Sequence, residues 1–250
     1  MLRRSVALAP LLLAVLIAFP ALAGFVDKHV KKGDRYFGYR GKGRQWCVKA
    51  IEMYEKALAV ETKNVEASWK LARASYWLGV HTDGDDAKLQ IYKKGIDVAK
   101  RAITIDAKSV ASHFWLGVSY GKYGETKGVT NSIALVDPIK KEMARVIELD
   151  EKFEGGGPHR VLGRLYHKLP GVLGGDADKA LEHLKKAVEI DKTRLLNHLF
   201  LAEVYIAADD KENAKKHLKF IIDAPAEADR APENAEEKAQ ARELLKGLAE

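Results

Sequence analysis

The sequence predicts an all-α fold: a right-handed α-solenoid of stacked helix pairs with a C-terminal capping helix. The first observation is a repeat, because four similar segments end in Glu61, Asp106, Asp150 and Asp191, which are 45, 44 and 41 residues apart. A period of this length is typical of repeated helix pairs. The second observation is the amphipathic segment 234–248, rich in Ala, Glu and Lys, which suits a helix that covers the exposed apolar end of such a stack.

A second pattern gives the kind of helix pair. Each acidic ending is followed, after ten to twelve residues, by a leucine beside a small residue, and mostly by a tyrosine three positions later. These residues are Leu71 and Ala72, Leu116, Gly117 and Tyr120, Leu162, Gly163 and Tyr166, and Leu201, Ala202 and Tyr205. This is the first-helix pattern of tetratricopeptide (TPR) repeats, in which the small residue lets the second helix approach closely.

We therefore expect five TPR-like repeats, at about 33–61, 65–106, 109–150, 157–191 and 195–223. Their period exceeds the usual ~34 residues because the earlier repeats carry insertions between their two helices. Two further segments are predicted to be irregular. Residues 33–45, rich in Gly and Arg, are predicted to form a loop before a helix at 47–60, and residues 225–232 a linker between two prolines.

The first 23 residues predict a secretory signal peptide. Arg3 and Arg4 precede the apolar stretch 6–19, and Ala21 and Ala23 form the small-x-small pattern that signal peptidase requires. With cleavage after Ala23, residues 24–250 form one exported, soluble domain, expected in the periplasm. Membrane attachment is expected only through an uncleaved signal, because no cysteine follows the cleavage site to carry a lipid.

Composition and motifs exclude several classes of function. The net charge of +7 is spread along the chain without a basic block, so nucleic acid is not an expected partner. Cys47 is the single cysteine, which leaves no internal disulfide and no cysteine metal motif. His113, His159 and His198 occupy equivalent repeat positions and are predicted to be structural. No catalytic residues, metal site or cofactor, and hence no enzyme, are expected.

One segment is more specific than the repeat itself. It runs from Gly155 to Tyr166 and continues through Pro170 to Asp176, and it resembles the T-component of TPR-associated tripartite ATP-independent periplasmic (TRAP) transporters. It is similar, more distantly, to the regulators of microtubule dynamics. The residues that carry the likeness are Gly156, Gly157, Pro158, Gly163, Pro170, Gly174, Gly175 and Asp176. The resemblance implies a periplasmic helical repeat protein that accompanies a solute-binding protein and can form homo-oligomers.

The first helices of the pairs are expected to line a concave groove. In register with the repeat, they present Trp69, Arg73, Tyr76, Phe114, Arg160, Arg164, His167, Leu199 and Glu203. Aromatic residues beside arginines suit a small ligand with an apolar body and a carboxylate, or an extended acidic peptide. The alternative is that the aromatic residues pack between helices. Likewise, the turn at 155–158 either binds an anion at a helix N-terminus or only permits a tight connection.

These observations lead to one functional hypothesis and one alternative. The hypothesis is an exported binding or adaptor protein that holds a small apolar or carboxylate ligand in its groove and contacts another envelope protein, such as a TRAP-type solute-binding protein. The alternative is a general envelope scaffold that recognises an extended peptide and has no small-molecule ligand.

Overall fold

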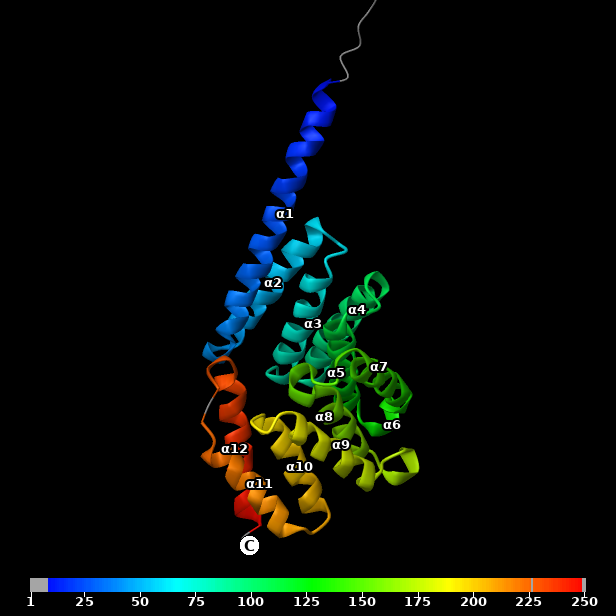
Figure 1. Cartoon of the computed structure of the whole chain (residues 1–250), viewed down its shortest axis with the longest axis vertical. Coiled ribbons are helices and arrows are strands. Elements are labelled where there is room, and N and C mark those ends of the chain that lie inside the picture. The colour runs from blue at the N-terminus through cyan, green and yellow to red at the C-terminus, as the bar shows by residue number, and fades with distance from the viewer. Residues whose placement is uncertain (1–8, 226, 249–250) are drawn as a thin grey trace, which may run out of the picture.

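The computed structural model describes residues 9–225 and 227–248, which form helices joined by short turns, with no strand among them (Figure 1). The α-helices are α1 (Ala9–Gly38), α2 (Arg44–Val60), α3 (Val65–Val80), α4 (Asp85–Ile105), α5 (Val110–Lys127), α6 (Val129–Ser132), α7 (Val136–Asp150), α8 (Phe153–Lys168), α9 (Ala177–Ile190), α10 (Leu195–Ala207), α11 (Lys211–Asp223) and α12 (Ala231–Gly247). Four 3-10 turns, η1 (Arg40–Lys42), η2 (Ile133–Leu135), η3 (Gly171–Leu173) and η4 (Ala228–Arg230), lie between them. The predicted all-α solenoid is confirmed.

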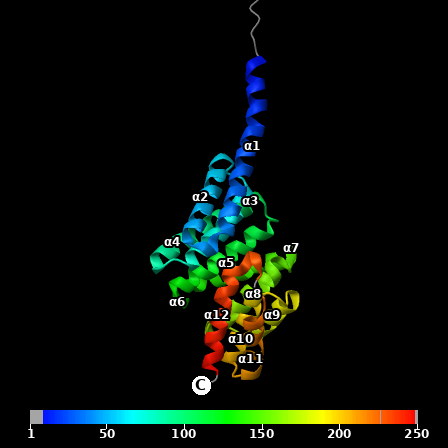
Figure 2. The same cartoon turned by 90° about the vertical axis from the view of Figure 1, so that its left-hand side faces the viewer.

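Consecutive helices pack as pairs: α1 with α2, α3 with α4, α5 with α7, α8 with α9, and α10 with α11. The short α6 and η2 occupy the connection between α5 and α7. Helix α12 packs on α10 and α11, and its first turn also contacts η1, near the other end of the chain (Figures 1 and 2). The C-terminal helix therefore brings the two ends of the stack together.

The apolar core is divided into three clusters. The main cluster runs from α1 to α8 and contains the buried Tyr54, Phe114 and Met143. A second joins α9 to α10 around Leu184 and Leu201, and a third joins α10, α11 and α12. Cys47 belongs to the main cluster and is fully buried, with its thiol 3.2 Å from the carbonyl oxygen of Ala74.

The predicted loop at 33–45 is wrong over most of its length, because Gly33 to Gly38 continue α1 and Arg44 begins α2. Gly33 serves packing and not a turn. A Cβ atom there would come within 2.5 Å of the Tyr54 ring on α2, so the glycine lets the two helices approach. The Tyr54 hydroxyl donates to Asp34 at 2.9 Å beside this contact.

The predicted linker at 225–232 is also partly wrong, because η4 and the start of α12 lie within it. Pro232 stands in the first turn of α12, where its missing N–H is not needed for the helix.

Residues 1–8 of the predicted signal peptide lie outside the described residues, and α1 runs through the expected cleavage point after Ala23. Within the described chain, no helix has both the length and the apolarity to cross a membrane.

The three repeat-equivalent histidines are buried between the helices of their pairs. In two repeats the partner is a second, half-buried histidine, since the Nδ1 atoms of His159 and His183 are 2.8 Å apart, as are those of His198 and His217. His198 Nε2 donates to the Lys192 carbonyl oxygen at 3.0 Å, which leaves its Nδ1 to accept from His217. In the remaining repeat a carboxylate replaces the second histidine, and the Glu142 Oε2 atom is 2.5 Å from His113 Nδ1.

These histidine pairs make folding sensitive to acid. Burial and the neighbouring His198 lower the pKa of His217 from its usual 6.5 to about 4, and burial with His159 lowers that of His183. The unfolded chain therefore binds more protons below pH 6.5, so the stability present above that pH decreases as the pH falls towards 4. Thermal unfolding by circular dichroism should show a falling midpoint over this range.

The His113–Glu142 pair supplies the control for this measurement. The substitutions His183→Glu and His217→Glu reproduce that arrangement, because each places a carboxylate against the partner imidazole. The variant's unfolding midpoint should change less between pH 6.5 and 5 than that of the unchanged chain. An equal acid sensitivity in both proteins would contradict the role of the pairs.

Candidate functional site

A central groove of about 920 Å³ runs along the inner helices of the stack. One wall comes from α3, α5, α8 and α10, the first helices of their pairs, as the repeat pattern predicts. The opposite side comes from the end of α1 with η1, and from η4 with α12. The groove is therefore bordered by both ends of the chain, and its lining joins residues that are about 200 positions apart in the sequence.

The structure brings six of the predicted groove residues together and leaves three outside. Those in the lining are Arg73, Tyr76, Phe114, Arg160, Arg164 and Leu199. Trp69 packs against the main apolar cluster with the Arg73 guanidinium over its ring. His167 is not part of the lining, and Glu203 lies just behind it, as an ion-pair partner of Arg164.

Aromatic side chains form much of the apolar wall. Phe114 and Trp115 meet edge to face, with ring centroids 5.1 Å apart, and Tyr76 lies 5.6 Å from Trp115. Phe114, Trp115 and Trp77 are each more than nine-tenths buried. These three rings therefore belong to the core as well, as the alternative of aromatic residues packed between helices predicts. Only their edges can reach a ligand. Further along the groove, Phe200 lies under the Arg164 guanidinium at 4.3 Å.

Three arginines gather where α8, α10 and η4 meet. Arg160 is buried, and its pKa is lowered to about 10, first by burial and then by the charge of Arg194, with a further contribution from Arg230. Arg194 and Arg230 both face Glu154, at 3.6 and 3.9 Å, too far for a normal hydrogen bond. Arg194 also faces Asp191 at 3.6 Å and Arg230 also faces Glu237 at 3.8 Å, again beyond hydrogen-bond distance. Buried nitrogens of both arginines have no hydrogen-bond partner among the described atoms. We call Arg160, Arg194 and Arg230 the arginine cluster.

Two other arginines of the groove are hydrogen-bonded to carboxylates. Arg40 donates to both oxygens of Glu233 at 2.7 Å, and Arg164 pairs with Glu203. A paired guanidinium is a poor place for an added anion, because the existing bidentate or short contact would have to break. The arginine cluster, whose carboxylate contacts are all longer than a hydrogen bond, is therefore better suited to an anionic group than Arg40 or Arg164.

The glycine-rich turn in the first part of α8 is held by a buried asparagine. Glu154, Gly155 and Gly156 have left-handed φ values of 52°, 62° and 75°. Asn197 donates to the Gly155 carbonyl oxygen at 2.9 Å and accepts from Arg160 Nη1 at 2.8 Å. The N–H groups of Gly155 and Gly156 donate to the Lys152 carbonyl oxygen. The turn thus uses these donors internally, which favours its structural interpretation over an anion site.

The rest of the family-like motif shapes the pair α8 and α9. A Cβ on Gly157 would lie 2.6 Å from the Phe114 ring, and one on Gly163 would lie 2.5 Å from Leu184. Gly174 has a φ of 93°, in the turn that follows Pro170. Asp176 caps α9 by accepting from the Lys179 N–H at 3.0 Å. Of the eight motif residues, none lines the groove.

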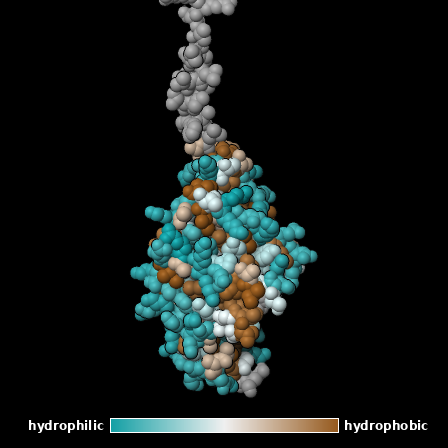
Figure 3. Space-filling model, turned by 90° about the vertical axis from the view of Figure 1, so that its right-hand side faces the viewer, coloured by the Kyte–Doolittle hydropathy of each residue, from teal (hydrophilic) through white to brown (hydrophobic). Residues whose placement is uncertain are grey.

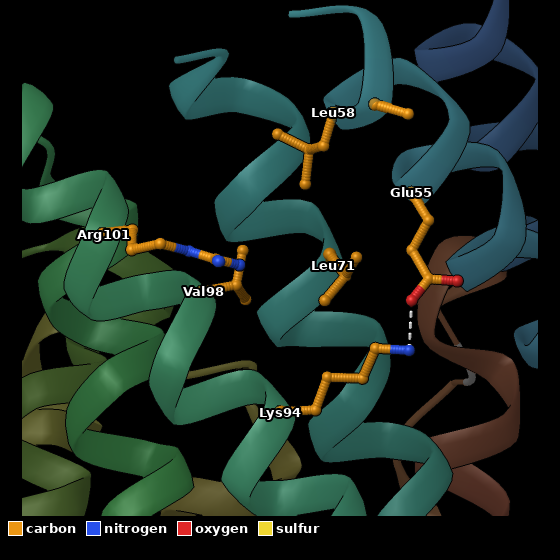
Figure 4. Close-up of a pocket in the computed structure, with 7 residues that line it drawn as sticks. Glu55, Leu58, Leu71, Lys94, Val98 and Arg101 are labelled. Atoms are coloured by element: carbon orange, nitrogen blue, oxygen red, sulfur yellow. Dashed lines mark ion pairs between the residues drawn. The ribbon is translucent and has the colours of Figure 1, made fainter. Parts of the chain in front are cut away.

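A smaller pocket of about 260 Å³ lies between α2, α3 and α4 (Figure 4). Leu58, Leu71 and Val98 line it, and a Lys94–Glu55 ion pair crosses its edge. None of the predicted site residues belongs to it.

The right-hand face of the molecule is largely hydrophilic, with hydrophobic residues gathered mainly in its lower half (Figure 3). Within the described chain, no three His, Cys, Asp or Glu side chains gather as metal ligands would.

Sequence reasoning missed the half of the groove that comes from the chain ends. Phe37, Arg40, Arg230 and Glu237 belong to segments predicted as loop, linker or cap, and Glu233 lies between the predicted linker and the predicted cap. Arg194 precedes α10 at its N-terminal end and was also missed. The repeat pattern carries no signal for these positions, because they lie outside the helical register it defines.

Comparison with known proteins gives a family and a set of relatives. The family model of the TRAP transporter T-component matches residues 44–250. The Homo sapiens protein named regulator of microtubule dynamics protein 1 is 26% identical over 202 residues, covering 73% of this chain and 62% of its own length. The Mus musculus regulator of microtubule dynamics protein 3 is 22% identical over 173 residues, 63% of this chain and 36% of that protein. The chain thus spans less than two thirds of either relative.

Solved structures share the architecture. A thermophilic TPR protein from Thermus thermophilus has a TM-score of 0.64 at 16% identity, over 90% of this chain and 98% of that one. The pilF protein of Pseudomonas aeruginosa has a TM-score of 0.58 at 14% identity, over 91% and 93%. Likeness at these identities shows the fold alone, which is that of a TPR protein.

The contact at Gly163 gives a stability prediction. Gly163→Ala should destabilise the protein by about 1–3 kcal/mol, because the added methyl group meets the buried Leu184 in a close-packed core. The matched control is Gly121→Ala on α5, where a Cβ meets nothing within 4 Å and alanine should stabilise the helix by about 0.5–1 kcal/mol. Urea unfolding measures both, and equal stabilities would contradict the packing account.

Proposed function

We infer the function from one premise: the chain belongs to the TRAP transporter T-component family. Family and fold make it a TPR-type adaptor with a protein partner. We propose that it is exported to the periplasm, that it holds a small ligand with an apolar body and a carboxylate in its central groove, and that it contacts a TRAP-type solute-binding protein.

The observation that carries the ligand proposal is the arginine cluster beside an apolar wall. Arg194 and Arg230 share Glu154 without a close hydrogen bond, and Arg160 lies next to them. A carboxylate at this point would accept charge-assisted hydrogen bonds from guanidinium groups that are already held in place. Arg73, Tyr76, Phe114, Arg164 and Leu199 are the further proposed binding residues, because they line the same groove.

The shape of the groove supports a small ligand over an extended peptide. An extended peptide needs a channel that is open along its length, whereas η4 and α12 border this groove on the side opposite α8 and α10. A volume of about 920 Å³ lies within the range of small-molecule sites. The protein partner is then expected on the outer surface, and the groove is left to the ligand.

A fluorescent fatty acid, cis-parinaric acid, tests the ligand proposal through its titration with the purified protein. The substitution Arg230→Gln should weaken binding of the acid by roughly tenfold to a hundredfold, as expected for the loss of a hydrogen bond to a charged group. Binding of its uncharged methyl ester should change little. The matched control is Arg242→Gln, on the exposed side of α12 and outside the groove lining.

The comparison between acid and ester is decisive. Equal losses for both probes would mean that Arg230 only supports the fold, and no saturable binding of either would rule out an apolar carboxylate ligand. Native mass spectrometry of the protein purified from its own envelope would show which molecules and which protein partner accompany it.

A further inference from the structure

Helix α12 is attached to the two sides of the groove by different kinds of contact. On the C-terminal side, Ala241, Leu244 and Leu245 pack with α10 and α11 in one apolar cluster. On the N-terminal side the contacts are polar or local. Glu233 pairs with Arg40, Glu236 accepts from His81 Nε2 at 2.7 Å, and Pro232 touches Gly41. No residue of α12 belongs to the main apolar cluster among the described residues.

This asymmetry decides which contact can open. Separating apolar surfaces exposes them to water, at about 25 cal/mol for each Å². An ion pair that separates instead regains hydration for both charges. Arg40 is buried and Glu233 is partly buried, and for such a pair the cost of removing the charges from water offsets much of their attraction, so its net contribution is small. Arg40 would also keep its contact with the Phe37 ring, at 4.7 Å, and its hydrogen bond to the Phe37 carbonyl oxygen.

We propose that α12 is a hinged gate over the groove, which opens when Arg40 separates from Glu233 and from the Asp229 carbonyl oxygen, and when the His81–Glu236 contact separates. Helices α10, α11 and α12 share their own apolar cluster, so they move as one unit. They pivot about the apolar packing of α9 on α10 and the Asn197 contacts with α8, which both stay closed. Opening widens the groove along the side where Glu233, Glu236 and Gln240 now stand. The proposal rests on the proposed function, because the gate controls access to the same groove.

Reversal of charge at the Arg40–Glu233 pair tests the gate without any ligand. Spin labels are attached at Glu52→Cys on α2 and Glu243→Cys on α12, both exposed positions, while the buried Cys47 stays unlabelled. Double electron–electron resonance should show one label separation in the parent protein and an added, longer one in Arg40→Glu and in Glu233→Arg. The double variant restores the pair with opposite signs and should restore the single separation.

The matched control reverses an exposed ion pair on α4 that is remote from the gate. Lys93→Glu changes the charge as Arg40→Glu does and breaks the contact with Asp97, yet it should leave the label separation unchanged. Circular dichroism checks that each variant keeps its helices. The gate is disproved if both single reversals keep the parental separation, or if the double variant fails to restore it while remaining folded.

A disulfide provides the second measurement. A Cβ on Gly41 would lie 3.0 Å from the Cβ of Pro232, so the two backbones need to move apart by roughly 0.5–1 Å to reach the ~3.8 Å of a disulfide. The variant Gly41→Cys with Pro232→Cys should therefore lock the gate when oxidised. Association of cis-parinaric acid, followed by stopped-flow fluorescence, should then slow by about tenfold or more, as expected when the open state is no longer populated, and recover when the disulfide is reduced.

The two measurements separate the two proposals. Equal association rates in the oxidised and reduced forms would show that the ligand does not enter past α12 and would overturn the gate. If the acid binds to neither form, the proposed ligand is wrong, and the label separations still decide whether α12 moves.

Discussion

Close approach of paired helices depends on side chains that are small enough to stand between two backbones. Ala99, Ala180 and Ala187 are fully buried at such contacts, and Gly163 has no room for a methyl group against Leu184. Because these positions fix the separation of each pair, they also fix the spacing of the inner helices. The width of the groove is therefore set by residues that no ligand would touch.

The charged part of the groove depends on the stack in the same way. Asn197 on α10 holds both the turn in the first part of α8 and the guanidinium of Arg160. Glu154, in that turn, faces Arg194 from the next repeat and Arg230 from η4. No single repeat contains this arrangement. It exists only when α8, α10 and η4 are packed together, so any binding at this point depends on the folding of these three elements.

The repeat made the architecture predictable, and the same dependence on register explains what was missed. Leucine–small pairs such as Leu162 and Gly163 recur with the packing period, so helices and their inner faces follow from sequence. Gly33 carries the same physical signal, a close approach to Tyr54, yet outside a recognisable repeat it resembles a loop glycine. Arg40 and Glu233 could not be paired from sequence, because nothing local indicates that residues 193 positions apart meet.

Trp69 shows that a residue inside the repeat register can also be placed wrongly. Its position in the repeat is that of a groove residue, but its ring packs on the main cluster beside Arg73. Register gives the direction of a helical position only to within part of a turn, and a large side chain takes whichever neighbouring space buries more of it. Pattern alone therefore separates the inner face from the outer one, while the division between core and lining needs coordinates.

The burial of Cys47 has a consequence for the proposed export of the chain. Burial raises the pKa of its thiol to about 12, so almost no thiolate exists near neutral pH, and thiolate is the form that attacks disulfides and oxidants. A lone accessible thiol in an oxidising compartment would couple chains or capture small disulfides. Because this sulfur is enclosed between α2 and α3 with the Ala74 carbonyl as its neighbour, the folded chain can pass through such a compartment chemically unchanged.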